Sequence, residues 1–505
     1  MKMTTKHAKV DTAIDTEFIY ARVLGIMATS RESVSIETLF SHELALQPTA
    51  LFYENGDMRT TSKAAMKNKI QIMSGVRNQE PPTVIMLDGC AILWTVPWPS
   101  APAKVSVFIT AAVTTILRRA HSASVLHVVF DRYYKLSTKS CCRTVRQKGT
   151  SRVYNLTENS PLPQQSVMLK VSENKEQLIK MIVHRLCTIQ PPPATDVVIT
   201  GPNPHPIHIG SGLQETPRYH EKAVVLMAFH VIHESSLGRT NIRVVSDDTD
   251  VLVILAHHLY KKTKGLSQDV TLTIESCAST YNVISVNDVI RQHAAIMPNL
   301  LVAHAMTGCD TVPSFAGIGK TTVLKKLKVF SGEIKLGQMS APFQEISESC
   351  LHFTGLLYGD ESGANLNTVR ANIFKERIAG KRHIPPKLSS LPPTMASFQA
   401  HIKRANFQAV LWQSAGEPSP PQLNPVDFGW QLYQSTLCPA LGLDDQLPAP
   451  DDVLNLVNCS CKTGCSTSKC TCTKQSITCT TFCKCKGNLE CNNPMTIVVP
   501  TDEDA

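Results

Sequence analysis

The sequence predicts an α/β fold: a mostly parallel, twisted sheet with helices on both faces, followed by helical extensions and a small cysteine-rich module. Three observations lead to this prediction. Short β-rich runs alternate with helical segments, aspartates stand where these runs end, and nine of the 17 cysteines lie between Cys459 and Cys491. Parallel strands need long crossover connections, and the intervening helices supply them.

Length and composition indicate a folded chain of several domains. Its 505 residues exceed one ordinary core, and 43% hydrophobic with 18% charged residues excludes disorder of the whole chain. A formal charge of +9 permits nucleic acid as a partner without demanding it. No apolar run follows the N-terminal charges, and the longest nearly apolar stretch, residues 105–117, is too short to cross a bilayer. We therefore expect an intracellular protein without membrane contact, in which thiols stay reduced.

Strands and helices are expected to alternate through the middle of the chain. The predicted strands are residues 83–87, 125–130, 196–200, 241–246 and 270–274. The predicted helices are residues 104–119, 174–186 and 217–233. In the second helix, apolar residues recur at the spacing of one buried face. The third has Thr216 as a candidate N-cap and Pro217 at the first helical position.

Changes of pattern give the expected domain limits. Residues 1–80 carry mixed helical patterns, and helical segments resume after residue 330, with Trp412 and Trp430 as expected core anchors. The predicted parts are an N-terminal helical extension (1–80), an α/β domain (81–330), a helical accessory region (331–445), a linker (446–458), a cysteine module (459–494) and an acidic tail (495–505).

Aspartates close three of the predicted strands. Asp88 ends TVIMLD, Asp131 ends VLHVVFD, the SDDTD run at 246–250 follows IRVV, and Asp310 stands further on in MTGCD. One aspartate after a strand is usually only a helix cap, but several at one sheet edge lie where parallel sheets bind ligands. Two carboxylates about 4 Å apart repel by roughly 4 kcal/mol at an effective dielectric near 20, so such a group needs cations or raised pKa values. Hard oxygen ligands suit Mg²⁺ or Mn²⁺, and two such ions can drive phosphodiester hydrolysis.

The order of these motifs resembles that of PIN-like nucleases of the flap-endonuclease type. The motifs are LDG (87–89), VVFDRYYK (128–135), SDDTDVLVIL (246–255) and TGCDTVPSFAGIGKTTVLKKL (307–327). The resemblance covers about residues 82–330 and implies a twisted sheet with an acidic two-metal pocket that cuts DNA or RNA. It implies metal-ligand roles in catalysis for Asp88, Asp131, Asp248, Asp250 and Asp310. Asp247 is an extra acid that can serve as a cap, and Lys135 would meet the scissile phosphate unless it is an ordinary solvated lysine.

The same resemblance implies a pair of acids at the start of the helix before the D-x-D strand, and here the sequence departs from it. Residues 220–224 are HEKAV, in which only Glu221 is acidic, while Lys222 and Val224 stand at the positions of the pair. A lysine competes with a metal and a valine cannot ligate one. Two hypotheses follow: a metal-dependent nuclease in which Glu221 takes over, or a DNA-binding or assembly protein that has lost the chemistry.

The AGIGKTTVLKKL segment (316–327) allows three interpretations. A nucleotide-binding P-loop would need a preceding strand and a glycine where the sequence has Ser314. A glycine turn that leads into a helix N-terminus can bind one DNA phosphate, as the flap-endonuclease resemblance also implies. The third interpretation is an amphipathic helix with solvated lysines. The expected nucleic-acid contacts in this segment are Gly317, Gly319, Lys320 and Lys325.

The C-terminal cysteines predict a zinc cluster, because thiolate-rich sites select zinc and a segment this short has almost no apolar core. Three zinc ions need about twelve bonds at four per ion, which six terminal and three bridging thiolates would supply. The expected ligands are Cys459, Cys461, Cys465, Cys470, Cys472, Cys479, Cys483, Cys485 and Cys491. Disulfides or scattered free thiols are the alternative.

The cysteine spacing is similar to that of the tesmin-type CXC domain, a zinc module that binds DNA. Members carry a tyrosine for minor-groove contact where this sequence has Lys469, and Phe482 precedes Cys483. Lys469 can contact phosphate without reading bases, and a purely structural or protein-binding cluster stays open. A PIN-like region followed by one CXC module resembles transposon-associated proteins of fish and marine invertebrates, which implies a mobile-element origin. Branched or single-stranded DNA is the expected partner, with a nuclear location; protein partners are not indicated.

Overall fold

A computed structural model shows how the chain folds. It describes residues 19–20, 23–24, 35–74, 81–120, 123–134, 136–139, 152–209, 219–267, 269–280, 282–363, 365–379, 385–433, 436–443, 447–450, 453, 459–462, 464–474, 479, 483–485 and 491–494. The chain forms two compact units: Met1–Gly56 with Asn365–Ser397 and Leu443–Ala505, and Asp57–Ala364 with Phe398–Gly442. The domain limits expected at residues 80 and 330 remain predictions.

The larger unit is built on a seven-stranded sheet in the order β4-β3-β2-β1-β5-β6-β7. Its parallel strands are β1 (Val84–Asp88), β2 (Val125–Val129), β3 (Asp196–Thr200), β5 (Asn241–Val245) and β6 (Thr271–Glu275). Each lies within one residue of a predicted strand, so the α/β fold class with a mostly parallel sheet is confirmed. The antiparallel edge strands β4 (Ile207–Ile209) and β7 (Val283–Ser285) were not predicted, because three residues show no period.

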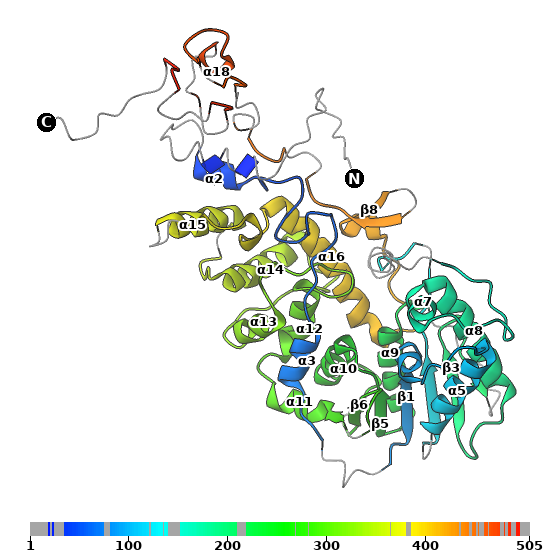
Figure 1. Ribbon diagram of the computed structural model, residues 1–505. Coiled ribbons are helices and arrows are strands. Elements are labelled where there is room, and N and C mark those ends of the chain that lie inside the picture. The colour runs from blue at the N-terminus through cyan, green and yellow to red at the C-terminus, as the bar shows by residue number, and fades with distance from the viewer. Residues whose placement is uncertain are drawn as a thin grey trace. The chain divides into compact units, whose positions relative to one another are not determined.

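Helices cover both faces of this sheet (Figure 1). One face packs Leu87 and Val128 against α4 (Gly89–Thr95), α5 (Val105–Arg118), α7 (Gln165–Lys170) and α8 (Ser172–Thr188). The other face contacts α9 (Ala223–Ser236), which lies beside α10 (Thr249–Lys261). Side chains alternate along a strand, so the apolar runs of β1 and β2 supply both layers. The predicted helices 104–119 and 174–186 correspond to α5 and α8.

The third predicted helix begins later than expected. Its described part starts at Ala223, with Lys222 as the N-cap residue, while Thr216 and Pro217 lie outside the described residues. The carbonyls before it have other partners: Arg132 donates through its guanidinium to His220 O at 2.8 Å and through its backbone N–H to Glu221 O at 3.0 Å. Arg132, just after β2, therefore binds residues 220–221, which would otherwise have formed the first turn of a longer α9.

The rest of the larger unit is mainly helical. Trp412 and Trp430 are only 1% and 2% exposed, which confirms them as core anchors. The elements are α3 (Ala64–Ile70), α11 (Val286–Gln292), α12 (Met297–Met306), α13 (Lys320–Leu327), α14 (Phe343–Tyr358), η3 (Ser414–Gly416), η4 (Pro425–Phe428), β8 (Trp430–Tyr433) and β9 (Thr436–Pro439), with α16 (Met395–Gln413) continuing from the smaller unit.

The smaller unit has its own apolar core and the cysteine cluster. Its described elements are α2 (Ile36–Phe40), α15 (Leu366–Ala379), η2 (Leu388–Ser390) and α18 (Thr471–Lys474). Phe40 and Phe374 pack together at the centre, with ring centroids 4.5 Å apart. Among the helices that the structure describes in either unit, none combines the length and the apolar composition needed to cross a membrane.

Candidate functional site

Asp88 and Asp131 lie at the ends of the neighbouring strands β1 and β2 and act as helix caps. Asp88 accepts a hydrogen bond from Ala91 N at 2.9 Å and a weaker one from Ser246 Oγ at 3.3 Å. Asp131 accepts from Ala223 N, the first residue of α9, at 2.9 Å, and Lys139 Nζ lies 3.7 Å away. Burial, and secondarily the charge of Asp131, raises the pKa of Asp88. The structure thus places both expected acids at one edge of the sheet.

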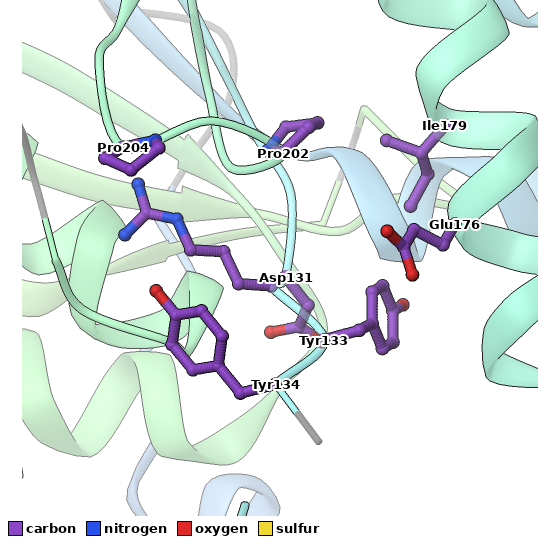
Figure 2. Close-up of a pocket in the computed structure, with 8 residues that line it drawn as sticks. Asp131, Tyr133, Tyr134, Glu176, Ile179, Pro202 and Pro204 are labelled. Carbon is purple, nitrogen blue, oxygen red and sulfur yellow. The ribbon is translucent and has the colours of Figure 1, made fainter. Parts of the chain in front are cut away.

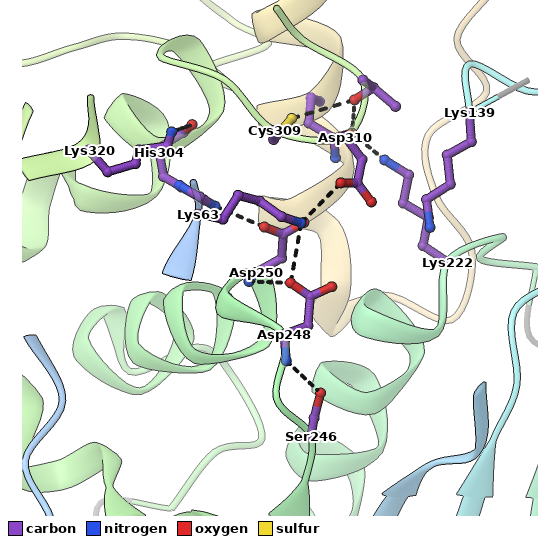
Figure 3. Close-up of polar contacts among 12 residues, drawn as sticks. Lys63, Lys139, Lys222, Ser246, Asp248, Asp250, His304, Cys309, Asp310 and Lys320 are labelled. Atoms are coloured by element: carbon purple, nitrogen blue, oxygen red, sulfur yellow. Dashed lines mark hydrogen bonds and ion pairs between the residues drawn. The ribbon is translucent and has the colours of Figure 1, made fainter. Parts of the chain in front are cut away.

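Asp248, Asp250 and Asp310 form a second group, which gathers around a lysine (Figure 3). Lys63 Nζ lies 3.3 Å from Asp248 Oδ1, 3.1 Å from Asp250 Oδ2 and 3.0 Å from Asp310 Oδ1. Lys63 directly precedes α3, in the segment where the sequence shows no decisive motif. Sequence reasoning missed this residue, and no pattern around it could have indicated it.

A buried histidine fixes Asp250 from the other side. His304 Nε2 lies 2.9 Å from Asp250 Oδ1, and the His304 ring stacks on Trp412 with centroids 5.6 Å apart. Burial acts against ionisation of Asp250, but Lys63 and His304 hold its pKa well below the usual range. Burial and the charge of Asp250 raise the pKa of Asp248 to about 6. The two carboxylates of the D-x-D motif are therefore electrostatically distinct.

The structure places Lys222 and Val224 where the acid pair was expected. Val224 is buried in the core of the unit, and the Lys222 ammonium is buried and donates to Gln408 Oε1. Gln408 Oε1 also accepts from Thr311 Oγ1 at 2.6 Å. Glu221, the expected substitute, accepts from Ser137 Oγ at 2.6 Å. Burial lowers the pKa of Lys222, and its charge lies close enough to Asp310 and Glu221 to interact with both.

The carboxylates, as they lie, do not fit a two-metal centre. Among the described residues, the groups of three or more His, Cys, Asp or Glu atoms within 4.8 Å of one another consist of cysteines alone. Three carboxylates do converge, but on an ammonium nitrogen at hydrogen-bond distances of 3.0–3.3 Å. A divalent ion draws its ligand oxygens much closer, to about 2.0–2.6 Å. The edge is built around a lysine, and its carboxylates do not form the ligand set of a hydrolytic Mg²⁺ or Mn²⁺ centre.

A pocket of about 110 Å³ lies beside Asp131 (Figure 2). Tyr133, Tyr134 and Glu176 line it together with Arg132. The guanidinium of Arg132 is already engaged, because it donates to Gly201 O at 2.7 Å, to His220 O at 2.8 Å and to Asn203 O at 3.0 Å. This arginine holds loops together rather than offering a free anion site.

The glycine turn before α13 has the expected backbone but not the expected lysine. Gly317 has a φ of +75°, which favours glycine, and Gly319 is the N-cap of α13. Lys320 is 1% exposed and donates to His304 O at 2.8 Å and to Thr307 Oγ1 at 3.0 Å, so its expected phosphate contact is wrong. Burial lowers the pKa of Lys320 to about 7. Lys325 is exposed, and Lys135 lies outside the described residues.

The cysteine cluster brings eight of the nine expected ligands into three overlapping groups of four. The groups are Cys459, Cys472, Cys479 and Cys483; Cys459, Cys465, Cys470 and Cys479; and Cys465, Cys479, Cys485 and Cys491. Cys479 belongs to all three, whereas Cys461 belongs to none.

The sulfur spacing in this cluster fits zinc. Cys459 Sγ lies 3.8 Å from Cys465 Sγ, and Cys472 Sγ lies 3.5 Å from Cys483 Sγ. A tetrahedral site with Zn–S bonds of about 2.3 Å has sulfurs roughly 3.8 Å apart, whereas a disulfide joins them at about 2.05 Å. The cysteines are free thiols, so the disulfide alternative is wrong, and the cluster could hold metal. Lys469 is exposed, and Phe482 lies outside the described residues.

The chain is similar to solved structures of flap endonucleases. The bacteriophage T5 flap endonuclease, in a pseudo-enzyme–product complex with DNA and metal ions, is 11% identical, with a TM-score of 0.33 over 66% of this chain and 97% of that chain. The catalytic core of Rad2 in complex with a DNA substrate is 11% identical, with a TM-score of 0.34 over 78% of this chain and 98% of that chain. No protein-family model and no curated protein matches the sequence. The residues of the sheet edge and of the cysteine cluster therefore carry the functional assignment.

Two histidines with lowered pKa values are expected to make the larger unit sensitive to acid. Burial lowers the pKa of His401 to about 3, although its Nε2 lies 2.8 Å from Met306 O, and burial likewise lowers the pKa of His257 to about 3. An unfolded histidine takes up a proton near pH 6.5, so below that pH the unfolded state binds protons that the folded state does not. The contribution of each such histidine to the free energy of unfolding is fully present above pH 6.5. Between pH 6 and 4 it falls by roughly 1.4 kcal/mol per pH unit.

Urea unfolding at pH 7, 6 and 5 checks this expectation. His401→Gln is expected to reduce the pH slope by roughly 1.4 kcal/mol per unit, whereas His184→Gln, at an exposed position, leaves it unchanged. Equal slopes in the wild type and His401→Gln would contradict a buried neutral His401.

Proposed function

We propose that this chain is a nucleic-acid-binding protein whose α/β domain is nuclease-like but binds the phosphate backbone without hydrolysing it. The observation that carries the proposal is the pair Lys63 and Lys222, whose ammonium groups stand at the acidic edge where hydrolysis needs bound metal. This corresponds to the second of the two hypotheses drawn from the sequence.

The nuclease-like character is supported by where the aspartates lie. Asp88, Asp131 and Asp248 follow the strands β1, β2 and β5, which are neighbours in the sheet. That edge is where parallel α/β sheets bind their ligands. The order of motifs along the chain agrees with this placement and resembles the flap-endonuclease type.

DNA binding is supported by basic side chains outside the acidic edge. Lys325 and Lys328 are exposed at the end of α13, which follows the open glycine turn at Gly317 and Gly319. Lysines of this kind attract phosphates without regard to sequence. Branched or single-stranded DNA is the proposed partner, because the resemblance is to nucleases that act on such strands.

A metal-dependent nuclease is the second candidate, and one observation favours it. Asp248 and Asp250, at the start of α10, and Asp310, from a distant segment, point to one place, which is what a cation site requires. For this activity Lys63 would have to leave that place. Glu221 would also have to exchange its partner Ser137 for the edge of the sheet.

The proposal includes the cysteine module, which would bind zinc and contact DNA as a CXC-type domain. Its support is the spacing of the cysteines and the tetrahedral sulfur distances, with about three zinc ions in shared coordination. Lys469 is exposed beside Cys470 and would contact phosphate. A nuclear location and a mobile-element origin belong to the same proposal and rest on DNA binding and on the resemblance.

The test measures binding and cleavage with one set of labelled DNAs. Zinc-loaded full-length chain is mixed with flapped, branched, single-stranded and duplex DNA, with Mg²⁺ or Mn²⁺ present. We expect salt-dependent binding and no cleaved product. Replacing Lys325 and Lys328 by alanine should weaken binding uniformly across sequences and lower the salt slope by about 2, or roughly 1 per phosphate contact.

Lys180→Ala is the matched control, because Lys180 is an exposed lysine on α8, in another part of the same unit. It should leave binding and the salt slope unchanged. Cleavage that disappears in Asp248→Ala with Asp250→Ala would establish the second candidate instead. Absence of binding to every DNA would contradict both.

A further inference from the structure

The acidic edge contains its own cation. We infer that the Lys63 ammonium is the resident counter-ion of Asp248, Asp250 and Asp310 and excludes divalent metal. Removal of its charge would open a divalent-cation site formed by these three carboxylates. The inference rests on the proposed function, because it explains why a nuclease-like edge would not act as a metal centre.

The geometry uses all the hydrogen-bonding capacity of Lys63. An ammonium has three N–H donors, and three carboxylate oxygens from three residues lie 3.0–3.3 Å from this nitrogen. The Lys63 side chain is 22% exposed and that of Asp250 is 6% exposed, so solvent screens the group only in part. A second cation bound to the same oxygens would have to displace the ammonium.

The charges show why some cation must be present. Three carboxylates this close repel one another strongly, and one ammonium offsets part of that repulsion. Burial would lower the pKa of Lys63, but the charges of Asp250, Asp248 and Asp310 raise it well above its usual range. Without Lys63 the three carboxylates would lose the cation that contacts all of them, and a hard divalent ion with oxygen ligands is the species that best replaces it. Because Lys63 is part of the same chain, its ammonium competes with a dissolved divalent ion for these carboxylates at a high effective concentration.

The surroundings are expected to survive removal of the Lys63 charge. Asp248 is the N-cap of α10 and accepts from Asp250 N at 3.0 Å, while His304 holds Asp250. Helix α3 is anchored by Met66 and Ile70, which are buried. The carboxylates of Asp248 and Asp250 are thus positioned by contacts that do not involve Lys63.

The experiment compares Mn²⁺ binding to zinc-loaded full-length variants, followed by electron paramagnetic resonance and by the melting temperature. Lys63→Met should bind Mn²⁺ at least about tenfold more tightly than the wild type, because the competing charge is gone. Without Mn²⁺ this variant should melt lower than the wild type, and Mn²⁺ should restore the melting temperature. Adding Asp310→Asn to Lys63→Met should abolish the gain.

Two matched variants separate this effect from a general change of charge. Lys63→Arg keeps the cation and should exclude Mn²⁺ as the wild type does. Lys67→Met removes a neighbouring lysine of α3, whose Nζ lies 3.8 Å from Asp247, and should gain no Mn²⁺ binding.

Two results would overturn the inference. One is a folded Lys63→Met that binds Mn²⁺ no better than the wild type. The other is a wild-type chain that already binds Mn²⁺ at this edge and loses it in Asp310→Asn, and this measurement stands even if Lys63→Met does not fold. Neither result depends on DNA, so failure of this inference is distinguishable from failure of DNA binding.

Discussion

Removal of zinc is expected to unfold the cysteine module while the α/β domain keeps its structure. Among the residues of this module that the structure describes, the buried cluster consists of cysteine side chains alone, which leaves it without an apolar core once metal is removed. Zinc binding to such modules contributes apparent free energies of about 10–16 kcal/mol. Elemental analysis after desalting should give about three zinc ions per chain at four thiolate bonds each. Circular dichroism and proteolysis before and after chelation check the structural consequence.

Single cysteine variants sharpen this prediction. Cys479 belongs to all three groups of potential ligands, so Cys479→Ser should lose most of the zinc. Cys461 belongs to none of the groups, and Cys461→Ser should retain it. Cys187→Ser, at an exposed free thiol far along the chain, is the control. Equal zinc loss in Cys479→Ser and Cys461→Ser would show that Cys461 is a ligand, as the sequence predicts. A wild-type chain without zinc would contradict the zinc site altogether.

Arg370→Ala is expected to destabilise the smaller unit by roughly 3–5 kcal/mol, because it leaves the carboxylate of Glu43 buried without a cation. Arg370 is fully buried, with a nitrogen 3.9 Å from Glu43 Oε2. It also donates to Phe40 O at 3.0 Å and His42 O at 3.1 Å, and to Pro392 O. Loss of the guanidinium removes these bonds together with the charge. The midpoint of urea unfolding measures the effect.

Two further variants test the cause of that loss. Lys375 lies on the same helix, α15, and forms an exposed ion pair with Glu37. Because water screens this pair, Lys375→Ala should leave the midpoint of urea unfolding almost unchanged. Adding Glu43→Gln to Arg370→Ala removes the unpaired charge and should recover part of the stability. A double variant no more stable than Arg370→Ala would show that lost hydrogen bonds, and not the buried carboxylate, dominate.

Much of the fold was accessible from the sequence because it depends on local patterns. The apolar runs that became β1, β2, β3, β5 and β6 are buried strands bounded by turns, and α5 and α8 show one apolar face. The start of α9 was not accessible. It depends on Arg132, in the loop after β2, which donates hydrogen bonds to the carbonyls of His220, 88 positions further along the chain, and of Glu221.

The sequence by itself determined which residue types stand at each strand end and at each cysteine position. Aspartates follow β1, β2 and β5, and the absence of an acid at Lys222 and Val224 is visible in the sequence alone. Only the tertiary structure decided what those aspartates face. Lys63 meets Asp248 across 185 positions of sequence, and Lys320 turns inward to His304 O and Thr307 Oγ1 instead of toward a phosphate. A lysine carries the same charge wherever it stands, and its role follows from the partners that compensate its burial, which the fold alone brings together.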